Sequence, residues 1–149
     1  MKETDIFLGF WISQIRLVND RIFEKLLLSN DLEISRGQWN IIFVLWGEDH
    51  LTISEISERT LLAKNTVSII VNDMVKKGIV QRNINPENRR EAIVSLTEHV
   101  RSLRGKYERI SKQMTEILCQ DLSEDDQKIL ADYLQRILRT LVRYEQEHQ

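Results

Sequence analysis

Between residues 51 and 97, the spacing of hydrophobic residues changes from a helical period to a strand period. Thr52 and Glu55 have the spacing of a capping box, which predicts a short helix starting at Thr52. The following run, 64–77, carries hydrophobic residues three and four positions apart, which predicts a second helix with one buried face. Gly78 is expected to end this helix, because glycine readily adopts the left-handed conformation that closes a helix.

After the second helix the pattern predicts two short strands, 79–84 and 91–96. Their connection contains the only proline of the chain, Pro86, and two adjacent arginines, Arg89 and Arg90. Asparagine followed by proline initiates turns, so the two strands are expected to form a hairpin. The predicted fold class is therefore mainly α with a small β-hairpin wing, a winged helix-turn-helix flanked by long helices. The usual work of such a unit is to read duplex DNA.

The second helix leaves small, polar side chains on its outer face near its start, where a recognition helix meets base edges in the major groove. The arginine pair at the hairpin tip can enter the neighbouring minor groove or contact phosphates, because a narrow groove has a negative potential. A solvated turn is the alternative interpretation of that pair. The predicted DNA-binding residues are Thr52, Ser54, Lys64, Asn65, Thr66, Ser68, Asn72, Lys76, Asn88, Arg89 and Arg90.

The hairpin also carries the residues of a known family signature, which reads roughly Asp-Pro-x-Asp-Arg-Arg followed by a strand ending in Leu-Thr. This chain has Asn-Pro-Glu-Asn-Arg-Arg at 85–90 and Leu-Thr at 96–97. On these residues it resembles the multiple antibiotic resistance regulator (MarR) family. The resemblance covers nearly the whole chain, because the flanking predicted helices lie where that family has them. It implies a sequence-specific transcriptional regulator, expected to repress from palindromic operators in double-stranded DNA.

Regulators resembling this family commonly respond to small, often aromatic or phenolic, molecules that bind where the winged unit meets the dimer helices. For this chain the resemblance implies a small-molecule effector in a crevice lined by Trp11, Trp39, Phe43 and Trp46. Tryptophans are more often core residues, and a packed core is the alternative for these side chains. No cofactor is expected.

The two ends of the chain, 1–30 and 98–147, are predicted to form a helical dimerisation region with wide apolar faces. A single small domain has too little interior to cover both faces. Packing them against a second copy removes apolar surface from water, at about 25 cal/mol per Å², and gives a two-fold interface. We therefore expect a homodimer of a single domain, 1–149, with 51–97 as its DNA-binding unit. An intramolecular helix bundle is the alternative.

Other local signals complete the expected helices. Ser35 and Gln38 have the spacing of a second capping box, and Ser123 is expected to cap the last helix. A helix over 101–112 is expected to leave the wing. Cys119 is expected on a helix, at least half buried, and as the only cysteine it allows no internal disulfide.

Composition and charge agree with a regulator-sized protein of 149 residues and net charge −2. Residues 51–97 hold seven basic and five acidic residues, so this segment carries +2 and the rest of the chain −4. The asymmetry has the sign that phosphate binding needs. No apolar run approaches the roughly 18 to 20 residues that span a bilayer, and no leader pattern is present, so a cytoplasmic protein without membrane contact is expected.

Catalytic chemistry is not indicated. The three histidines lie far apart in the sequence, which gives no zinc-ligand spacing, and no phosphate loop, nucleophile elbow or Cys-x-x-Cys pair is present. We predict no catalytic residue and no metal site, and an enzyme is a distant third hypothesis. The second hypothesis is a winged-helix protein-interaction module without DNA binding, because Ile69 and Asp73 stand where recognition helices of the family often carry basic residues.

Overall fold

The computed structural model describes residues 2–149, and the side chains of these residues except those of 3–6. The chain divides into two compact units, Met1–Ile110 (unit 1) and Ser111–Gln149 (unit 2). Within the described residues, no helix is both long and apolar enough to cross a membrane.

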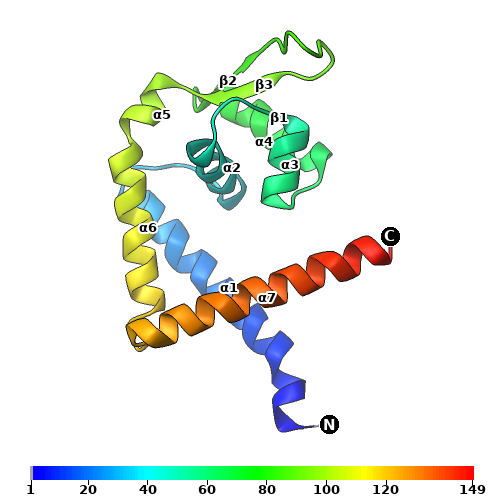
Figure 1. Ribbon diagram of the computed structural model, residues 1–149. Helices are drawn as coiled ribbons and strands as arrows, with labels where there is room; N and C mark the ends of the chain where they lie inside the picture. Colours follow the sequence, from blue (N-terminus) through cyan, green and yellow to red (C-terminus); the bar gives the residue numbers. More distant parts are fainter. Residues whose placement is uncertain (1) are drawn as a thin grey trace. The chain divides into compact units, whose positions relative to one another are not determined.

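Unit 1 contains the winged helix-turn-helix, and its helices lie beneath a small sheet (Figure 1). This arrangement confirms the predicted fold class. In chain order the elements are α1 (Glu3–Ser29), α2 (Arg36–Gly47), β1 (Leu51–Thr52), α3 (Ile53–Thr60), α4 (Lys64–Lys76), β2 (Val80–Asn83), β3 (Ile93–Leu96), α5 (Glu98–Ser102) and the start of α6 (Arg104–Leu118).

Both predicted capping boxes of unit 1 are present. The Thr52 hydroxyl accepts the Glu55 amide, and the Glu55 carboxylate accepts the Thr52 amide at 2.8 Å. Ser35 and Gln38 make the same reciprocal bonds at the start of α2. Each box satisfies two backbone donors that a helix start otherwise leaves free, so α2 and α3 begin at residues set by local sequence.

The core of the winged unit is the buried side of α4. Val67, Val71 and Met74 are fully buried, and α4 contacts both α2 and α3. Ile56 of α3 and Ile42 of α2 are also fully buried. The predicted three- and four-residue spacing on α4 therefore marks its core face, and burial of each such side chain contributes about 1.5–3 kcal/mol relative to exposure.

The sheet has three strands instead of the predicted two. β3 lies between β1 and β2 and pairs antiparallel with both, with Val94 opposite Leu51 on one side and Arg82 on the other. The prediction missed β1 because Leu51–Thr52 is too short to show a period and its partner lies 41 or more residues away. β1 ties the start of α3 to the base of the wing.

Polar side chains fix the base of the wing. The Thr97 hydroxyl donates to the Gly78 carbonyl at 2.8 Å and also caps α5. Asp49 accepts the Leu96 amide at 3.1 Å and pairs with Arg101 at 2.6 Å. The Leu-Thr motif at 96–97 is therefore held in place by hydrogen bonds to Asp49 and Gly78.

A helix leaves the wing as expected, but the predicted bounds of 101–112 are wrong. The chain forms the short helix α5, breaks at Leu103, and continues as α6 to Leu118. Thr97 starts α5 earlier than expected because it is an N-cap that accepts the Val100 amide. Cys119 is more than half buried, as expected, but it lies in the turn directly after α6 and not within the helix.

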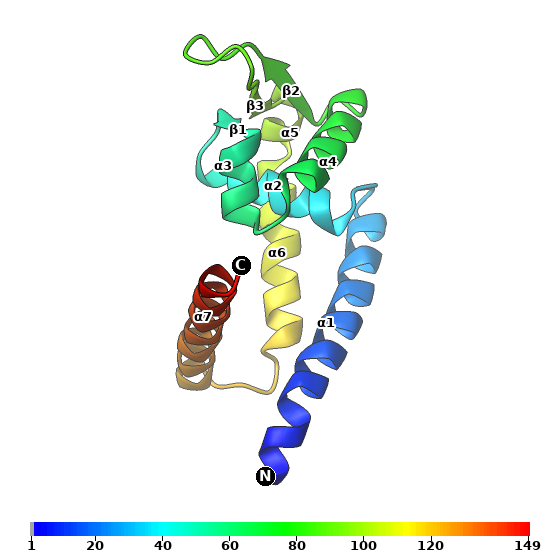
Figure 2. The same ribbon diagram turned by 90° about the vertical axis from the view of Figure 1, so that its right-hand side faces the viewer.

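The C-terminal part of α1 is attached to α2 through aromatic packing. Phe23 makes an edge-to-face contact with Trp39, whose ring stacks on Tyr107 of α6. The guanidinium of Arg36 lies 4.5 Å from the Phe23 ring centre and 3.8 Å from Asp20. The N-terminal half of α1 projects away from α2 and the sheet (Figure 2). The exposed hydrophobic residues of this N-terminal half include Phe7, Phe10, Trp11 and Ile15.

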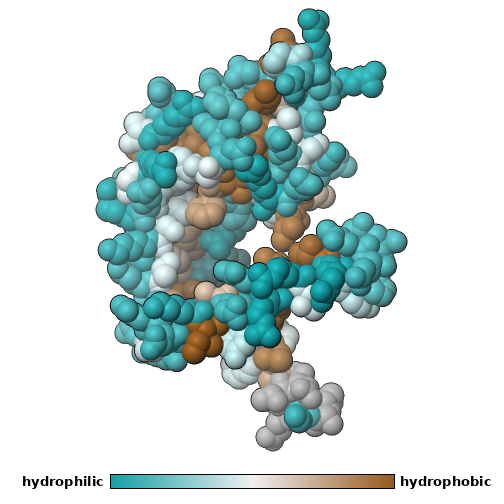
Figure 3. Space-filling view, viewed as in Figure 1, coloured by the Kyte–Doolittle hydropathy of each residue, from teal (hydrophilic) through white to brown (hydrophobic). Residues whose placement is uncertain are grey.

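Unit 2 contains the end of α6 and α7 (Glu124–Glu147). Ser123 caps α7 as predicted, and a reciprocal bond with Asp126 completes a capping box. α7 has no buried residue. Brown, hydrophobic surface is visible along it in Figure 3. The exposed apolar residues of α7 are Ile129, Tyr133, Leu134, Ile137, Leu138, Leu141 and Tyr144.

We predict that Gly78→Ala lowers the free energy of unfolding by about 1 kcal/mol, because the left-handed conformation costs an L-residue about 1–2 kcal/mol. Gly78 has φ +69°, and nothing lies within 4 Å of the added Cβ, so no steric clash contributes. Gly47→Ala is the matched control, since Gly47 is helical and equally unobstructed. Denaturant unfolding should show Gly47→Ala unchanged or more stable, and equal losses in both variants would contradict the backbone explanation.

Candidate nucleic-acid interface

The outer face of α4 is the candidate interface for base edges. Asn65, Ile69, Asn72 and Lys76 follow one another at spacings of four, three and four, so they form one row along the helix. All four are exposed, and the row lies opposite the buried Val67–Met74 side. Of the other predicted contacts on α4, Lys64 and Thr66 are exposed, and Ser68 is half buried.

The start of α4 differs from the starts of its neighbours. Ser35, Thr52 and Thr97 each accept a backbone amide at the beginning of a helix. Ala63 occupies the corresponding position of α4 and has no side-chain oxygen to do so. The amides of the first turn are therefore uncapped by a side chain, next to the exposed Lys64. Such a helix start is suited to accept a phosphate oxygen.

Asp73 does not present a free carboxylate to the interface. Its Oδ2 accepts the side-chain amide of Gln38 at 2.6 Å and lies 3.1 Å from Nζ of Lys77. Gln38 is buried at the start of α2, where its side-chain oxygen accepts the Ser35 amide. The Asp73 carboxylate therefore links α4 to α2 and is balanced by Lys77. This contact helps to hold α4 against α2. A hydrogen bond to a charged group contributes about 1.5–3 kcal/mol to the free energy of unfolding.

Two predicted contact residues at the start of α3 are already engaged within the protein. Ser54 donates both its amide (2.9 Å) and its hydroxyl (2.5 Å) to Glu91 in the wing loop. These hydrogen bonds, with a smaller contribution from the charge of Lys64, hold the pKa of Glu91 below its ordinary value. Thr52 uses its hydroxyl oxygen as the α3 cap. The Ser54–Glu91 contact, termed the wing latch below, joins the wing to α3.

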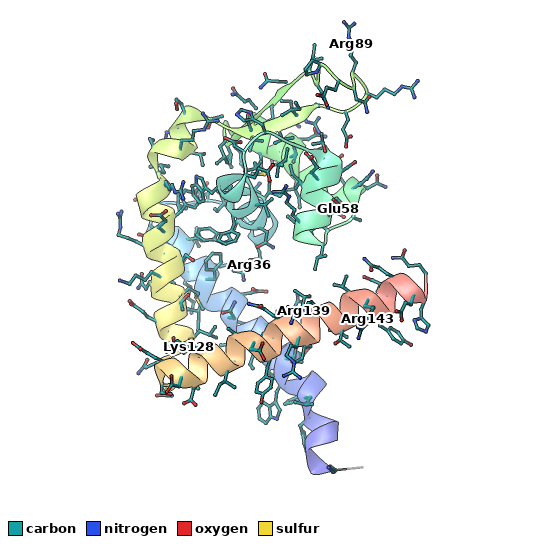
Figure 4. The ribbon with its side chains drawn as sticks, viewed as in Figure 1. Arg36, Glu58, Arg89, Lys128, Arg139 and Arg143 are labelled. Carbon is teal, nitrogen blue, oxygen red and sulfur yellow. The ribbon has the colours of Figure 1, made fainter. Side chains whose placement is uncertain are left out.

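The tip of the wing is a pair of asparagine turns that presents arginines to solvent. Oδ1 of Asn85 accepts the Glu87 amide at 3.0 Å, and Oδ1 of Asn88 accepts the Arg90 amide at 3.1 Å. Arg89 and Arg90 are exposed, and Arg89 points away from the sheet at the tip (Figure 4). Among the described residues, no carboxylate pairs with Arg89 or Arg90. Their charges are available to an external anion.

The four aromatic residues predicted to line a ligand crevice differ in their surroundings. Trp39 is buried, and it packs against Tyr107, as does Trp46. Burial raises the pKa of the Tyr107 hydroxyl. Phe43 is 63% exposed and Trp11 57% exposed. Trp39 and Trp46 therefore fit the core alternative within one protomer.

A small hollow of about 320 Å³ lies beside Trp46. Two arginines line this hollow, and each is paired with a carboxylate, Arg101 with Asp49 and Arg104 with Glu108. Among the side chains that the structure describes, those of residue 2 and residues 7–149, no group of three metal-ligating His, Cys, Asp or Glu residues gathers. The candidate interface of unit 1 therefore consists of α4 and the wing.

Sequence reasoning missed the roles of Gln38 and Glu91. Gln38 was recognised only as a capping residue, and Glu91 only as the start of a strand. Their partners, Asp73 and Ser54, lie 35 and 37 residues away. The one available signal for Gln38 was its place in a helix otherwise rich in apolar residues.

Comparison with known proteins identifies relatives of this chain. Residues 32–91 match the sequence profile of the MarR family. The chain is 28% identical over 114 residues to the organic hydroperoxide resistance transcriptional regulator of Bacillus subtilis (strain 168), with 76% of each protein covered. It is 29% identical over 89 residues to the HTH-type transcriptional repressor IacR of Pseudomonas putida, with 60% of this chain and 52% of that relative covered.

The fold also matches solved structures. A mutant MarR from E. coli complexed with operator DNA superposes with a TM-score of 0.81 at 21% identity. The match covers 91% of this chain and 96% of that chain.

The wing latch predicts a pH-dependent effect of Ser54→Ala. Because the folded-state pKa of Glu91 lies below its unfolded value of about 4.3, its stabilising contribution is present above that value and is lost as pH falls through the folded pKa. Ser54→Ala should raise the Glu91 pKa and reduce the free energy of unfolding at pH 7. The difference from wild type should disappear at acidic pH.

Carboxyl NMR titration and denaturant unfolding at several pH values measure this effect. Ser102→Ala is the control, because its hydroxyl donates to the His99 carbonyl and to no carboxylate. A Ser54→Ala difference that stays constant with pH would contradict the latch.

Proposed function

We propose that the chain is a MarR-family transcriptional regulator, because residues 32–91 match the profile of that family, and that it is a repressor that binds palindromic operator DNA as a homodimer. The family and the relatives named above are regulators of transcription and not enzymes. In this proposal, α4 reads the major groove and the wing contacts the adjacent backbone or minor groove. In this proposal the DNA-binding residues are those named from the sequence, and the hydroxyl groups of two of them, Thr52 and Ser54, are also engaged within the protein as described above.

The observation that carries the proposal is the combination of α4 and the wing on one unit. α4 offers a row of exposed, mostly polar groups with an uncapped helix start, and the wing offers two exposed arginines with no carboxylate partner among the described residues. Base edges require the first kind of surface, and phosphates the second. The solved MarR structure with the same fold was crystallised with operator DNA, which supports this use of the fold.

Homodimerisation is supported by the exposed apolar faces of α1 and α7. Phe10, Trp11 and Ile15 on α1, and Leu134 and Leu138 on α7, are each about half exposed or more. Contiguous apolar surface of this kind marks an interaction site. A two-fold dimer would bring two α4 helices to one duplex, which is the arrangement that reads a palindrome.

Repression and release by a small aromatic ligand are the finer parts of the proposal. The name of the relative IacR describes a repressor. Trp11 and Phe43 are exposed within one protomer, so they are available to line a crevice with a second copy. Trp39 and Trp46 would then contribute only edges of their packed rings. Equilibrium titration with aromatic acids and phenols, read as loss of operator binding, tests this part.

Selection of bound duplexes from random DNA by the purified protein tests the main proposal. We expect one enriched sequence with two inverted half-sites, bound with a strong dependence on salt concentration. Binding of a protein partner without any enriched duplex would instead support the protein-interaction module.

Replacement of Arg89 and Arg90 by alanine should weaken binding to operator and random duplex alike. The fold should be unaffected, because both side chains are exposed at the wing tip. The slope of log affinity against log salt should become shallower by up to about 1.8 per protomer, since each lost phosphate contact removes about 0.9.

The matched control is Arg139→Ala with Arg143→Ala, which removes the same charge from the polar side of α7 (Figure 4). Its salt slope should equal that of wild type. An unchanged slope in the wing variant would show that the wing does not contact DNA.

If the apolar faces form a homodimer, the melting temperature should rise with protein concentration, because association is coupled to folding. Leu134→Glu or Leu138→Glu should lower both stability and operator affinity, since a buried unpaired carboxylate is costly. Gln135→Glu adds the same charge on the opposite side of α7 and should leave the dimer intact. A monomeric mass for the wild type at micromolar concentration, measured by sedimentation, would contradict the dimer.

A further inference from the structure

We infer that Ile69 is a specificity-determining residue that contacts the methyl group of a thymine in each operator half-site. The inference rests on the proposed function and deepens it, because it assigns a base to a position on α4. It starts from the most exposed apolar side chain of that helix: Ile69 is 71% exposed, whereas Val67, Val71 and Met74 are fully buried.

The location of Ile69 on α4 is central to the candidate interface. It lies in the row formed with Asn65, Asn72 and Lys76, on the side opposite Met74. Its neighbour Ile70 is half buried, with Cδ1 close enough to α2 that a Cβ added at Gly37 would lie 2.8 Å away. The two adjacent isoleucines thus have different surroundings, and only Ile70 takes part in packing α4 against α2.

The negative charge next to Ile69 is balanced by a cation of the protein. Asp73, one turn after Ile69, is held by Gln38 and Lys77. The remaining neighbours in the row are two amides and the cation of Lys76. Ile69 therefore lies between amides and a cation, and the half-exposed Asp73 carboxylate beside it is paired with Lys77.

The chemistry of the major groove identifies the base. Among the four bases of DNA, thymine alone presents a methyl group there, and apolar side chains contact it. The side-chain amide of asparagine hydrogen-bonds to the N6 and N7 atoms of adenine. Ile69 between Asn65 and Asn72 therefore fits a run of A·T pairs, with the isoleucine against the thymine methyl group. The polar members of the row cannot supply this apolar contact.

Single replacement of each operator thymine by deoxyuridine tests the contact, because this change removes only the methyl group. The full chain is titrated with the duplex obtained by selection and with each deoxyuridine variant. We expect one thymine per half-site at which the wild-type affinity falls about fourfold, as for one methyl-sized group lost from an apolar contact. Ile69→Ala should bind the thymine duplex at least fourfold more weakly and show no further loss with deoxyuridine at that position.

Leu28→Ala is the matched control, since Leu28 is a similarly exposed apolar residue at the end of α1 and outside the winged unit. It should keep the wild-type response to deoxyuridine. If a duplex is enriched but Ile69→Ala and wild type respond equally at every position, the thymine contact is wrong and operator binding stands. If no duplex is enriched, the proposed function fails, and this inference fails with it.

Discussion

The burial of one face of α4 is the constraint on which the rest of unit 1 depends. Val67, Val71 and Met74 are fully enclosed, and α4 contacts α2, α3 and β2. A 13-residue helix with one face fixed in a core has no freedom to rotate. The opposite row, from Asn65 to Lys76, is therefore displayed in a fixed orientation. The hydrophobic effect thus positions polar groups that themselves contribute little to stability.

Hydrogen bonds between distant segments refine that position. Gln38–Asp73 links α4 to α2, and Ser54–Glu91 links the wing to α3. In both contacts a carboxylate accepts from an uncharged donor, and such charge-assisted hydrogen bonds are stronger than those between two neutral groups. Each contact engages a carboxylate beside the surface proposed to meet phosphates. The same side chains therefore help to fix the orientation of α4 and the wing.

The two hydrophobic surfaces of the chain have different roles. The core of unit 1 is closed by α2, α3, α4 and the sheet, whereas the apolar residues of α7 and of the N-terminal half of α1 are exposed. Ile69 is a third case, a single apolar group among polar ones. Its role in our account is discrimination between bases, which needs only one methyl-sized contact. Proposed dimerisation instead needs wide faces, since association must offset the lost freedom of two chains.

Local sequence determined the starts of α2, α3 and α7, the buried face of α4, the left-handed Gly78 and the arginine-tipped wing, because capping, helical period and turn chemistry act within a few residues. Resemblance in the wing and Leu-Thr motifs indicated the family. Only the tertiary structure decided that β1 joins the sheet, that Asp73 faces Gln38, that Ser54 is bound by Glu91, and that Trp39 is packed while Trp11 is exposed. Each of these depends on partners or surroundings brought together from distant parts of the chain. Local periodicity carries no information about such contacts, because burial of the core is what places the partners within bonding distance.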